Sequence, residues 1–167
     1  GHGTDRALNA GLMGMQPDDV RIPRSLQLAP EAGLTVEIGR IDLRGAHPNS
    51  VLLRLSRPGA HLTVQASSLG GGRVRVNAID GMAASFDGEA PTLIIRNEDR
   101  PGMVGEVSAV LSRREMNIAT MQPYRDRRGG LAVMVLEFDQ PVPPAVRAEL
   151  REQPGIHSVT YLNLEGM

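Results

Sequence analysis

The pattern of apolar residues in the second half of the chain most strongly limits the fold. Residues 131–138 are almost continuously apolar, which predicts a strand buried on both faces. Around it we expect a strand over 92–96, a helix opening near Pro101, a strand over 117–121, a helix opened by Pro143-Pro144 and running through Leu150, and a strand over 156–161. The order strand, helix, strand, strand, helix, strand is the ferredoxin-like βαββαβ arrangement.

The first half, to about residue 88, predicts a separate unit of helices and strands. Helices are expected over 4–15 and 22–32, with Gly33 capping the second. Alternating apolar residues predict four strands, over 34–38, 51–55, 62–66 and 74–76. Four strands with two helices on one side make an α+β sandwich. We place the boundary near residues 86–90, which gives domains over 1–88 and 90–167.

Composition excludes several classes of function. Aromatic residues make up 2% of the chain and tryptophan is absent, which argues against stacking on nucleic-acid bases. No apolar run approaches the roughly 20 residues of a membrane span, so we expect neither a nucleic acid nor a membrane as a partner. The absence of lysine excludes Schiff-base chemistry. The absence of cysteine fits a cytoplasmic location and leaves no thiolate for an iron–sulfur cluster.

Two loops of the first half carry polar groups that a plain core does not require. One is His-Pro-Asn at 47–49, and the other is Ser-Ser-Leu-Gly-Gly-Gly at 67–72. Consecutive glycine amides beside serine hydroxyls can cradle a carboxylate or a phosphate, although a flexible hairpin is the alternative reading. The predicted substrate- or anion-binding residues are His47, Asn49, Ser68, Gly70, Gly71 and Gly72.

The chain opens on Gly-His-Gly-Thr-Asp, a histidine flanked by glycines and followed by a helix. The glycines free the backbone to bring His2 close to a ligand, and a histidine changes protonation near neutral pH, as a catalytic base must. The alternative is that Gly-His is left over from a purification tag. Because residue 1 is not methionine, we expect that the sequence begins at a cut end.

These motifs resemble known families. The opening Gly-His-Gly-Thr-Asp-Arg-Ala and the following Gly-Leu-Met-Gly are similar to a segment in the beta subunit of bacterial iron–sulfur L-serine dehydratases, in which the His-Pro-Asn and Ser-Leu-Gly-Gly-Gly loops also recur. The two loops appear in looser form in the anion-binding domain of some phosphoglycerate dehydrogenases. The Pro-Ser-Ser-Ser-His-Thr motif of the dehydratases is absent here. In the second half, Asp-Arg-Pro-Gly and Asn-Ile-Ala resemble the ACT domain.

The dehydratase resemblance implies a lyase subunit that takes part in converting L-serine to pyruvate and ammonia. It implies catalytic roles for His2, Thr4 and Asp5. The [4Fe–4S] cluster of such enzymes is then held by the partner alpha subunit, and we expect no metal site in this chain. Without that partner the chain is expected to be inactive.

The ACT resemblance implies a site for a small amino acid, with L-serine the first ligand to test and the identity of the ligand left open. The implied effector-binding residues are Asn97, Asp99, Gly102, Asn117 and Ile118, of which Asn117 acts across the interface of a homodimer. Alternatively, Asn97 and Asp99 merely cap the helix. Two other functions remain open: the serine-sensing regulatory tail of a phosphoglycerate dehydrogenase, and a free-standing amino-acid-binding ACT module.

Overall fold

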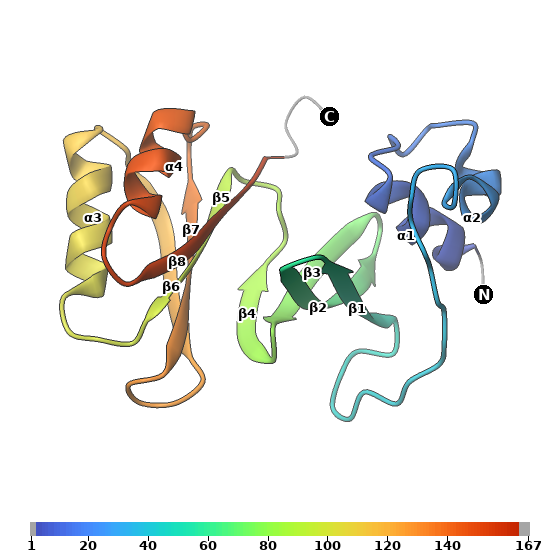
Figure 1. Ribbon diagram of the computed structural model, residues 1–167, viewed down its shortest axis with the longest axis horizontal. Helices are drawn as coiled ribbons and strands as arrows, with labels where there is room; N and C mark the ends of the chain where they lie inside the picture. Colours follow the sequence, from blue (N-terminus) through green and yellow to red (C-terminus); the bar gives the residue numbers. More distant parts are fainter. Residues whose placement is uncertain (1–2, 164–167) are drawn as a thin grey trace. The chain divides into compact units, whose positions relative to one another are not determined.

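The computed structural model describes residues 3–163, which divide into two compact units at residues 44 and 45. The first unit is helical, with α1 over Thr4–Leu12, a 3-10 turn over Ile22–Arg24 and α2 over Ser25–Leu28 (Figure 1). The hydroxyl of the buried Ser25 donates a hydrogen bond of 2.7 Å to the carbonyl of Arg6, and this bond ties α2 to α1. Gly33, with φ 74°, lies in the turn after α2 and does not cap the helix as predicted, because α2 ends at Leu28.

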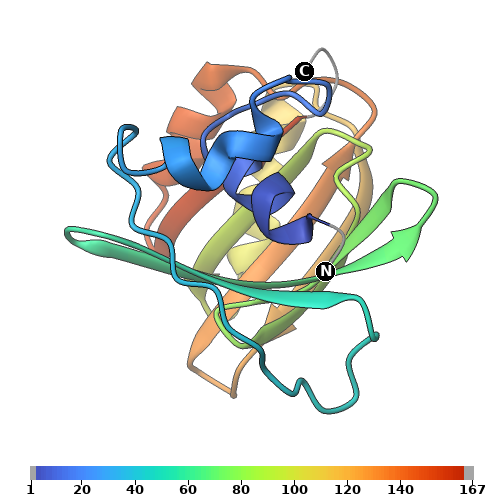
Figure 2. The same cartoon turned by 90° about the vertical axis from the view of Figure 1, so that its right-hand side faces the viewer.

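The strand predicted over 34–38 is wrong, because residues 34–43 form neither helix nor strand (Figure 2). The alternation of apolar residues is present there, but a strand also needs a neighbouring strand to complete its hydrogen bonds. In this unit the segment pairs with no other strand, and the side chains of Ile38 and Ile41 are 60% and 54% exposed. The helix predicted over 22–32 is likewise reduced to two short pieces.

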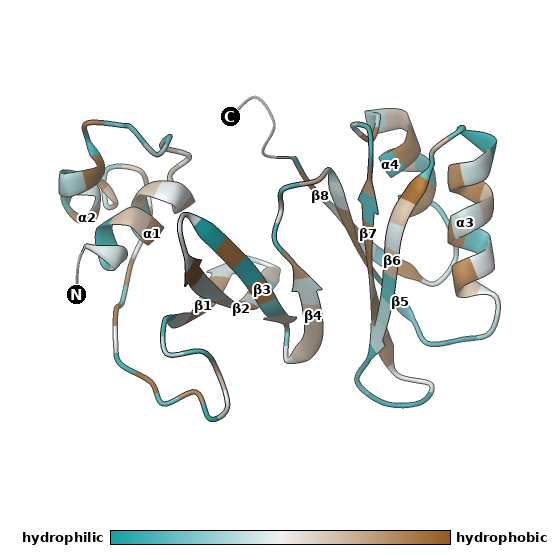
Figure 3. Cartoon of the chain, turned by 180° about the vertical axis from the view of Figure 1, so that it is seen from behind, coloured by the Kyte–Doolittle hydropathy of each residue, from teal (hydrophilic) through white to brown (hydrophobic). Residues whose placement is uncertain are grey.

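The second unit begins with a four-stranded antiparallel sheet in the order β1-β2-β3-β4. Its strands are β1 (Ser50–Arg57), β2 (Ala60–Gly70), β3 (Arg73–Ile79) and β4 (Met82–Phe86). The turn expected at Pro58 and Gly59 joins β1 to β2. The regular alternation of arginine and valine at the start of β3 is visible in Figure 3. The fourth strand of this sheet is therefore β4, which the sequence did not predict, and not the segment over 34–38.

The second sheet has the predicted βαββαβ arrangement, with strand order β6-β7-β5-β8. The strands are β5 (Thr92–Glu98), β6 (Ile118–Arg125), β7 (Leu131–Phe138) and β8 (Ile156–Leu162), and the helices are α3 (Met103–Arg113) and α4 (Pro144–Arg151). Both helices lie on the same side of this sheet (Figure 1). The α+β class with two antiparallel sheets is thus confirmed.

The second sheet is covered on both of its faces. On one face, Leu93, Ile95 and Leu136 pack with buried residues of α3 and α4. On the other, Ile94, Val133 and Val135 pack against the buried face of β4, which consists of Met82, Ala84 and Phe86. This double burial explains why residues 131–138 are apolar without interruption.

Candidate functional site

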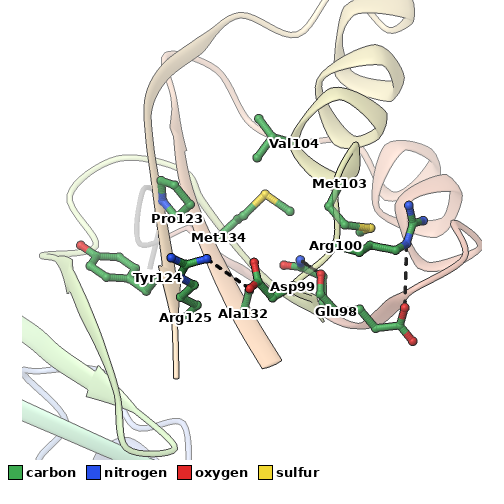
Figure 4. A pocket seen from close by; sticks show the side chains of 11 residues that line it. Glu98, Asp99, Arg100, Met103, Val104, Pro123, Tyr124, Arg125, Ala132 and Met134 are labelled. Atoms are coloured by element: carbon green, nitrogen blue, oxygen red, sulfur yellow. Dashed lines mark hydrogen bonds and ion pairs between the residues drawn. The ribbon is translucent and has the colours of Figure 1, made fainter. Parts of the chain in front are cut away.

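A cavity of about 270 Å³ lies where α3 begins. Its walls come from the loop before α3, the first turn of α3 and the ends of β5, β6 and β7 (Figure 4). The lining residues are Asn97, Glu98, Asp99, Arg100, Met103, Val104, Pro123, Tyr124, Arg125, Ala132 and Met134. The cavity therefore contains Asn97 and Asp99, two of the residues predicted from the sequence.

Strand register explains how this cavity forms. Ala132 of β7 pairs with Asn97 of β5 on one side and with Arg125 of β6 on the other, so the three residues form one row across the sheet. Paired residues of an antiparallel sheet point to the same face. The small side chain in the middle of the row leaves space between the two longer polar ones.

The start of α3 is held in place by an ion pair. Gly102, with φ 92°, is the residue before the helix, a conformation that favours glycine. The guanidinium of Arg100 donates hydrogen bonds of 2.9 and 2.8 Å to the two carboxylate oxygens of Glu106, and these bonds hold the pKa of Glu106 below its usual value. A further bond of 2.9 Å joins Arg100 to the carbonyl of Pro154. These bonds hold the Arg100 side chain in place beside the start of α3.

Asn97 presents a buried hydrogen-bond acceptor at the cavity wall. Its side chain is 2% exposed, and its Nδ2 donates to the carbonyl of Glu98 at 2.7 Å. Its Oδ1 has no hydrogen-bond partner among the residues that the structure describes. A buried acceptor without a partner costs about 1–3 kcal/mol, so this oxygen is suited to receive a donor from a bound molecule.

Asp99 and Arg125 place opposite charges at the same cavity. The Oδ2 of Asp99 accepts a hydrogen bond of 2.9 Å from the amide of Gly129 and one of 3.4 Å from the guanidinium of Arg125. The side chain of Arg125 is 61% exposed, and that of Asp99 is 25% exposed. Both groups are thus accessible to a zwitterion, although Asp99 also anchors the β6–β7 hairpin.

The other predicted effector residues lie elsewhere or beside the cavity. Gly102 caps α3 next to it. Asn117 and Ile118 lie at the opposite end of β6 from Arg125, and Nδ2 of Asn117 donates to Asp139 at 3.1 Å. Within one chain they do not line the cavity. The contribution of Asn117 from a partner subunit stays a prediction.

Sequence reasoning missed the residues that β6 and β7 bring to the cavity, chiefly Pro123, Arg125 and Met134. They lie more than twenty positions from the Asp-Arg-Pro-Gly loop, so motif spacing gives no sign of them. The signal that was available is the antiparallel register, which places the end of β6 beside the end of β5 through the short residue Ala132.

A second group of predicted residues meets at one end of the first sheet. The amide of Ser68 donates to the carbonyl of Asn49 at 2.9 Å, and the amide of Asn49 donates to Nδ1 of His47 at 3.2 Å. Beneath them the buried hydroxyl of Ser67 lies 2.8 Å from that of Ser50. The structure therefore brings the His-Pro-Asn loop directly against the serines of β2.

The three glycines that follow are each required by the backbone. Gly71 and Gly72 form the two-residue turn between β2 and β3 with φ of 62° and 78°, as in a type I′ hairpin. Gly70, with φ 84°, lies at a shift in strand register next to the turn. The hairpin thus uses all three glycines. Their binding of an anion stays a prediction.

Strands β1, β2 and β3 of the first sheet lie in a stretch of sequence without acidic residues. From residue 43 to residue 79 there is no aspartate or glutamate, although the chain contains 19 of them. The same stretch contains Arg44, Arg54, Arg57, Arg73 and Arg75. Arg75 pairs with Ser67 and therefore shares its face of the sheet. Sequence reasoning missed this basic character, which a scan of charge along the chain reveals.

The predicted catalytic residues belong to the first unit. Thr4 and Asp5 open α1, whereas His2 lies outside the described residues. Within the described ranges no group of three or more histidine, cysteine, aspartate or glutamate side chains could hold a metal ion. Because the sequence has no cysteine, its donor set does not fit an iron–sulfur cluster. No helix in residues 3–163 has the length and apolar character needed to cross a membrane.

Comparisons with known proteins identify the family. A model of the ACT domain matches residues 91–155. The L-serine dehydratase beta chain of Peptoniphilus asaccharolyticus is 35% identical over 90% of this chain and 68% of its own length, and a probable L-serine dehydratase beta chain of Bacillus subtilis is 31% identical over 97% and 74%. A D-3-phosphoglycerate dehydrogenase of Archaeoglobus fulgidus is 28% identical over 95% of this chain but only 31% of its own length. The chain belongs to the family of L-serine dehydratase beta chains and carries a C-terminal ACT domain.

Proposed function

We propose that this chain is the beta subunit of an iron–sulfur L-serine dehydratase, a lyase that converts L-serine to pyruvate and ammonia in the cytoplasm. The observation that carries the proposal is the similarity to dehydratase beta chains along nearly the whole chain, across both units. The D-3-phosphoglycerate dehydrogenase of Archaeoglobus fulgidus matches a comparable stretch of this chain with lower identity and over only 31% of its own length, which is why a regulatory tail of that enzyme ranks second. The alpha subunit is the proposed partner and the holder of the [4Fe–4S] cluster.

In this proposal His2 removes the α-proton of L-serine. Loss of that proton and of the β-hydroxyl group gives aminoacrylate and water. Hydrolysis of its imine tautomer then consumes a water molecule and yields pyruvate and ammonia. Thr4 and Asp5, at the start of α1, orient the histidine or the substrate.

The end of the first sheet where the His-Pro-Asn loop contacts the serines of β2 is the proposed binding site for a carboxylate or another anion. His47, Asn49 and Ser68 supply polar groups there, and Gly70, Gly71 and Gly72 supply exposed backbone. The acid-free stretch around them supports this assignment, because five arginines give the segment a positive field.

The cavity at α3 is the proposed effector site. Asn97 and Asp99 bind the ammonium group of an amino acid, and the helix N-terminus after Gly102 receives the carboxylate. Asn117 and Ile118 act from a second copy of the chain in a homodimer formed through the ACT domain. We place the boundary between the catalytic and regulatory domains at residues 88–90, between β4 and β5.

The proposal is tested by anaerobic reconstitution with the alpha subunit and measurement of pyruvate formation. We expect the chain alone to be inactive and the complex to be active. His2→Ala should lower turnover about 10²–10⁴-fold, the usual contribution of a general base, without changing the circular dichroism spectrum. His157→Ala, at an exposed position on β8, is the matched control. Equal turnover in both variants would leave His2 without a catalytic role.

A further inference from the structure

We propose that the cavity at α3 binds an α-amino acid with an apolar side chain, of the size of leucine or methionine, in preference to L-serine. The inference rests on the effector role proposed above and names the class of ligand. If it is right, the amino acid that regulates the enzyme through the ACT domain differs from the amino acid that the enzyme consumes.

The polar side of the cavity recognises only what all α-amino acids share. The unpaired Oδ1 of Asn97 and the carboxylate of Asp99 are acceptors for an ammonium group. The exposed guanidinium of Arg125 and the N-terminus of α3 are suited to a carboxylate. These groups fix the orientation of the ligand and leave its side chain to be selected by the remaining walls.

The remaining walls are apolar. Figure 4 shows Val104, Pro123 and Met134 lining the cavity above Asp99 and Arg125 in this view. Met134 is 1% exposed, so its side chain is part of the core as well as of the wall. The hydroxyl of the nearby Tyr124 is already hydrogen-bonded to Gln122.

These walls disfavour a hydroxyl group. The side chains of valine, proline and methionine contain no nitrogen or oxygen, so a serine hydroxyl placed among them would exchange its hydrogen bonds with water for none. An aliphatic or thioether side chain would instead bury apolar surface against them. The chemistry of the walls therefore selects against serine, the substrate that the dehydratase resemblance implies.

The size of the cavity points the same way. Its volume of about 270 Å³ has room for several water molecules, since one molecule needs about 10–15 Å³ of space of this kind. L-Serine would leave part of this space to water held against apolar walls. A larger apolar side chain would displace that water, and the flexible side chains of Met103 and Met134 can adapt to its shape.

The test is calorimetric titration of this chain with L-leucine, L-methionine, L-serine and glycine, with D-leucine as the control for stereochemistry. We expect L-leucine or L-methionine to bind at least about 10-fold more tightly than L-serine, the usual discrimination of an apolar pocket. Arg125→Gln should weaken every L-amino acid similarly, which places the binding in this cavity. Arg125 is 61% exposed, so the variant is expected to fold.

Val104→Thr is the variant that isolates the apolar wall. It puts a hydroxyl at a position that is 45% exposed and lines the cavity. Val74→Thr makes the same change at a position that is 49% exposed on β3, in the other sheet. We expect Val104→Thr to weaken L-leucine several-fold more than L-serine, and Val74→Thr to change neither.

Two results would overturn the inference, and they differ in what else they overturn. If L-serine binds as tightly as L-leucine or more tightly, and Arg125→Gln weakens it, the effector site stands but its proposed ligand class is wrong. If no amino acid binds to the chain or to its complex with the alpha subunit, the effector function fails together with the inference.

Discussion

The guanidinium of Arg96 in β5 lies 2.6 Å from the carboxylate of Asp80, in the turn between β3 and β4. The other carboxylate oxygen of Asp80 accepts a hydrogen bond of 2.7 Å from the amide of Thr63 in β2, and its amide donates one of 2.7 Å to the carbonyl of Thr63. Asp80 therefore links β2 to the turn between β3 and β4, and links that turn to β5 of the second sheet. Arg96 directly precedes Asn97, which lines the cavity at α3.

Replacing Asp80 should destabilise the second unit. Asp80→Ala removes the partner of a guanidinium that is 27% exposed, together with a hydrogen bond to a backbone amide. We expect the free energy of unfolding to fall by about 1–3 kcal/mol, measured by urea denaturation. Glu89→Ala, at an exposed position in the loop after β4, is the control and should cost no more than about 0.5 kcal/mol. Equal losses of unfolding free energy in the two variants would show that the contacts of Asp80 between the sheets stabilise the unit no more than an exposed loop residue does.

The Arg100–Glu106 ion pair should make stability depend on acidity. Hydrogen bonds with Arg100 lower the pKa of Glu106 from 4.5, so the pair stabilises the folded chain above that pH. As the pH falls below 4.5 and then through the lowered pKa, the carboxylate is protonated and this contribution is lost. The free energy of unfolding, measured from pH 6 to pH 3 in steps of roughly one pH unit, should fall less for Glu106→Gln than for the parent chain. Arg100→Gln should have the same effect, and a decline as steep as the parent's in both variants would contradict the prediction.

Asp99 should matter to amino-acid binding through its charge. The substitution Asp99→Ala also removes the acceptor for the amide of Gly129, whereas Asp99→Asn keeps an oxygen there and removes only the charge. We expect Asp99→Asn to abolish amino-acid binding in calorimetry. The mass of the particle measured by light scattering should be the same as for the parent chain. If Asp99→Asn retains full affinity, the ammonium group is bound elsewhere.

The first sheet should bind anions on the face of Arg75 and Ser67. Titration with inorganic phosphate is expected to give saturable binding that weakens several-fold in Arg75→Gln. The control is Arg57→Gln, at an exposed position on the opposite face, at the other end of β1 from Ser50. Because binding by arginine is electrostatic, affinity should fall with added salt. Equal weakening by the two variants would indicate general charge attraction without a site.

The sequence predicted the second sheet well because its local patterns agree with its tertiary surroundings. Residues 131–138 form β7 with the bounds expected, since burial on both faces makes their pattern unambiguous. The segment over 34–38 has an equally good alternation but pairs with no other strand in its unit. Strand β4 escaped prediction because Met82, Ala83 and Ala84 are weak strand formers whose burial is decided by the second sheet.

In the candidate site, Asn97 could be predicted from the local sequence and Arg125 could not. Asn97 and Asp99 belong to a loop whose order along the chain indicates its role at the start of α3. Arg125 reaches the same cavity only because β6 and β5 flank Ala132 of β7. A single sequence contains the first kind of information directly. The second depends on strand pairing, which becomes available only once the sheet has been assembled.

The position of β4 also restricts how two copies of the chain can meet. Since β4 covers Ile94, Val133 and Val135 on the surface of the second sheet that faces away from α3 and α4, this part of the surface is closed to a neighbouring molecule. The outer strands β6 and β8 still have one unpaired side each. A homodimer of the kind that we propose would therefore form edge to edge, with β6 or β8 of one copy pairing with a strand of the second copy and extending the sheet.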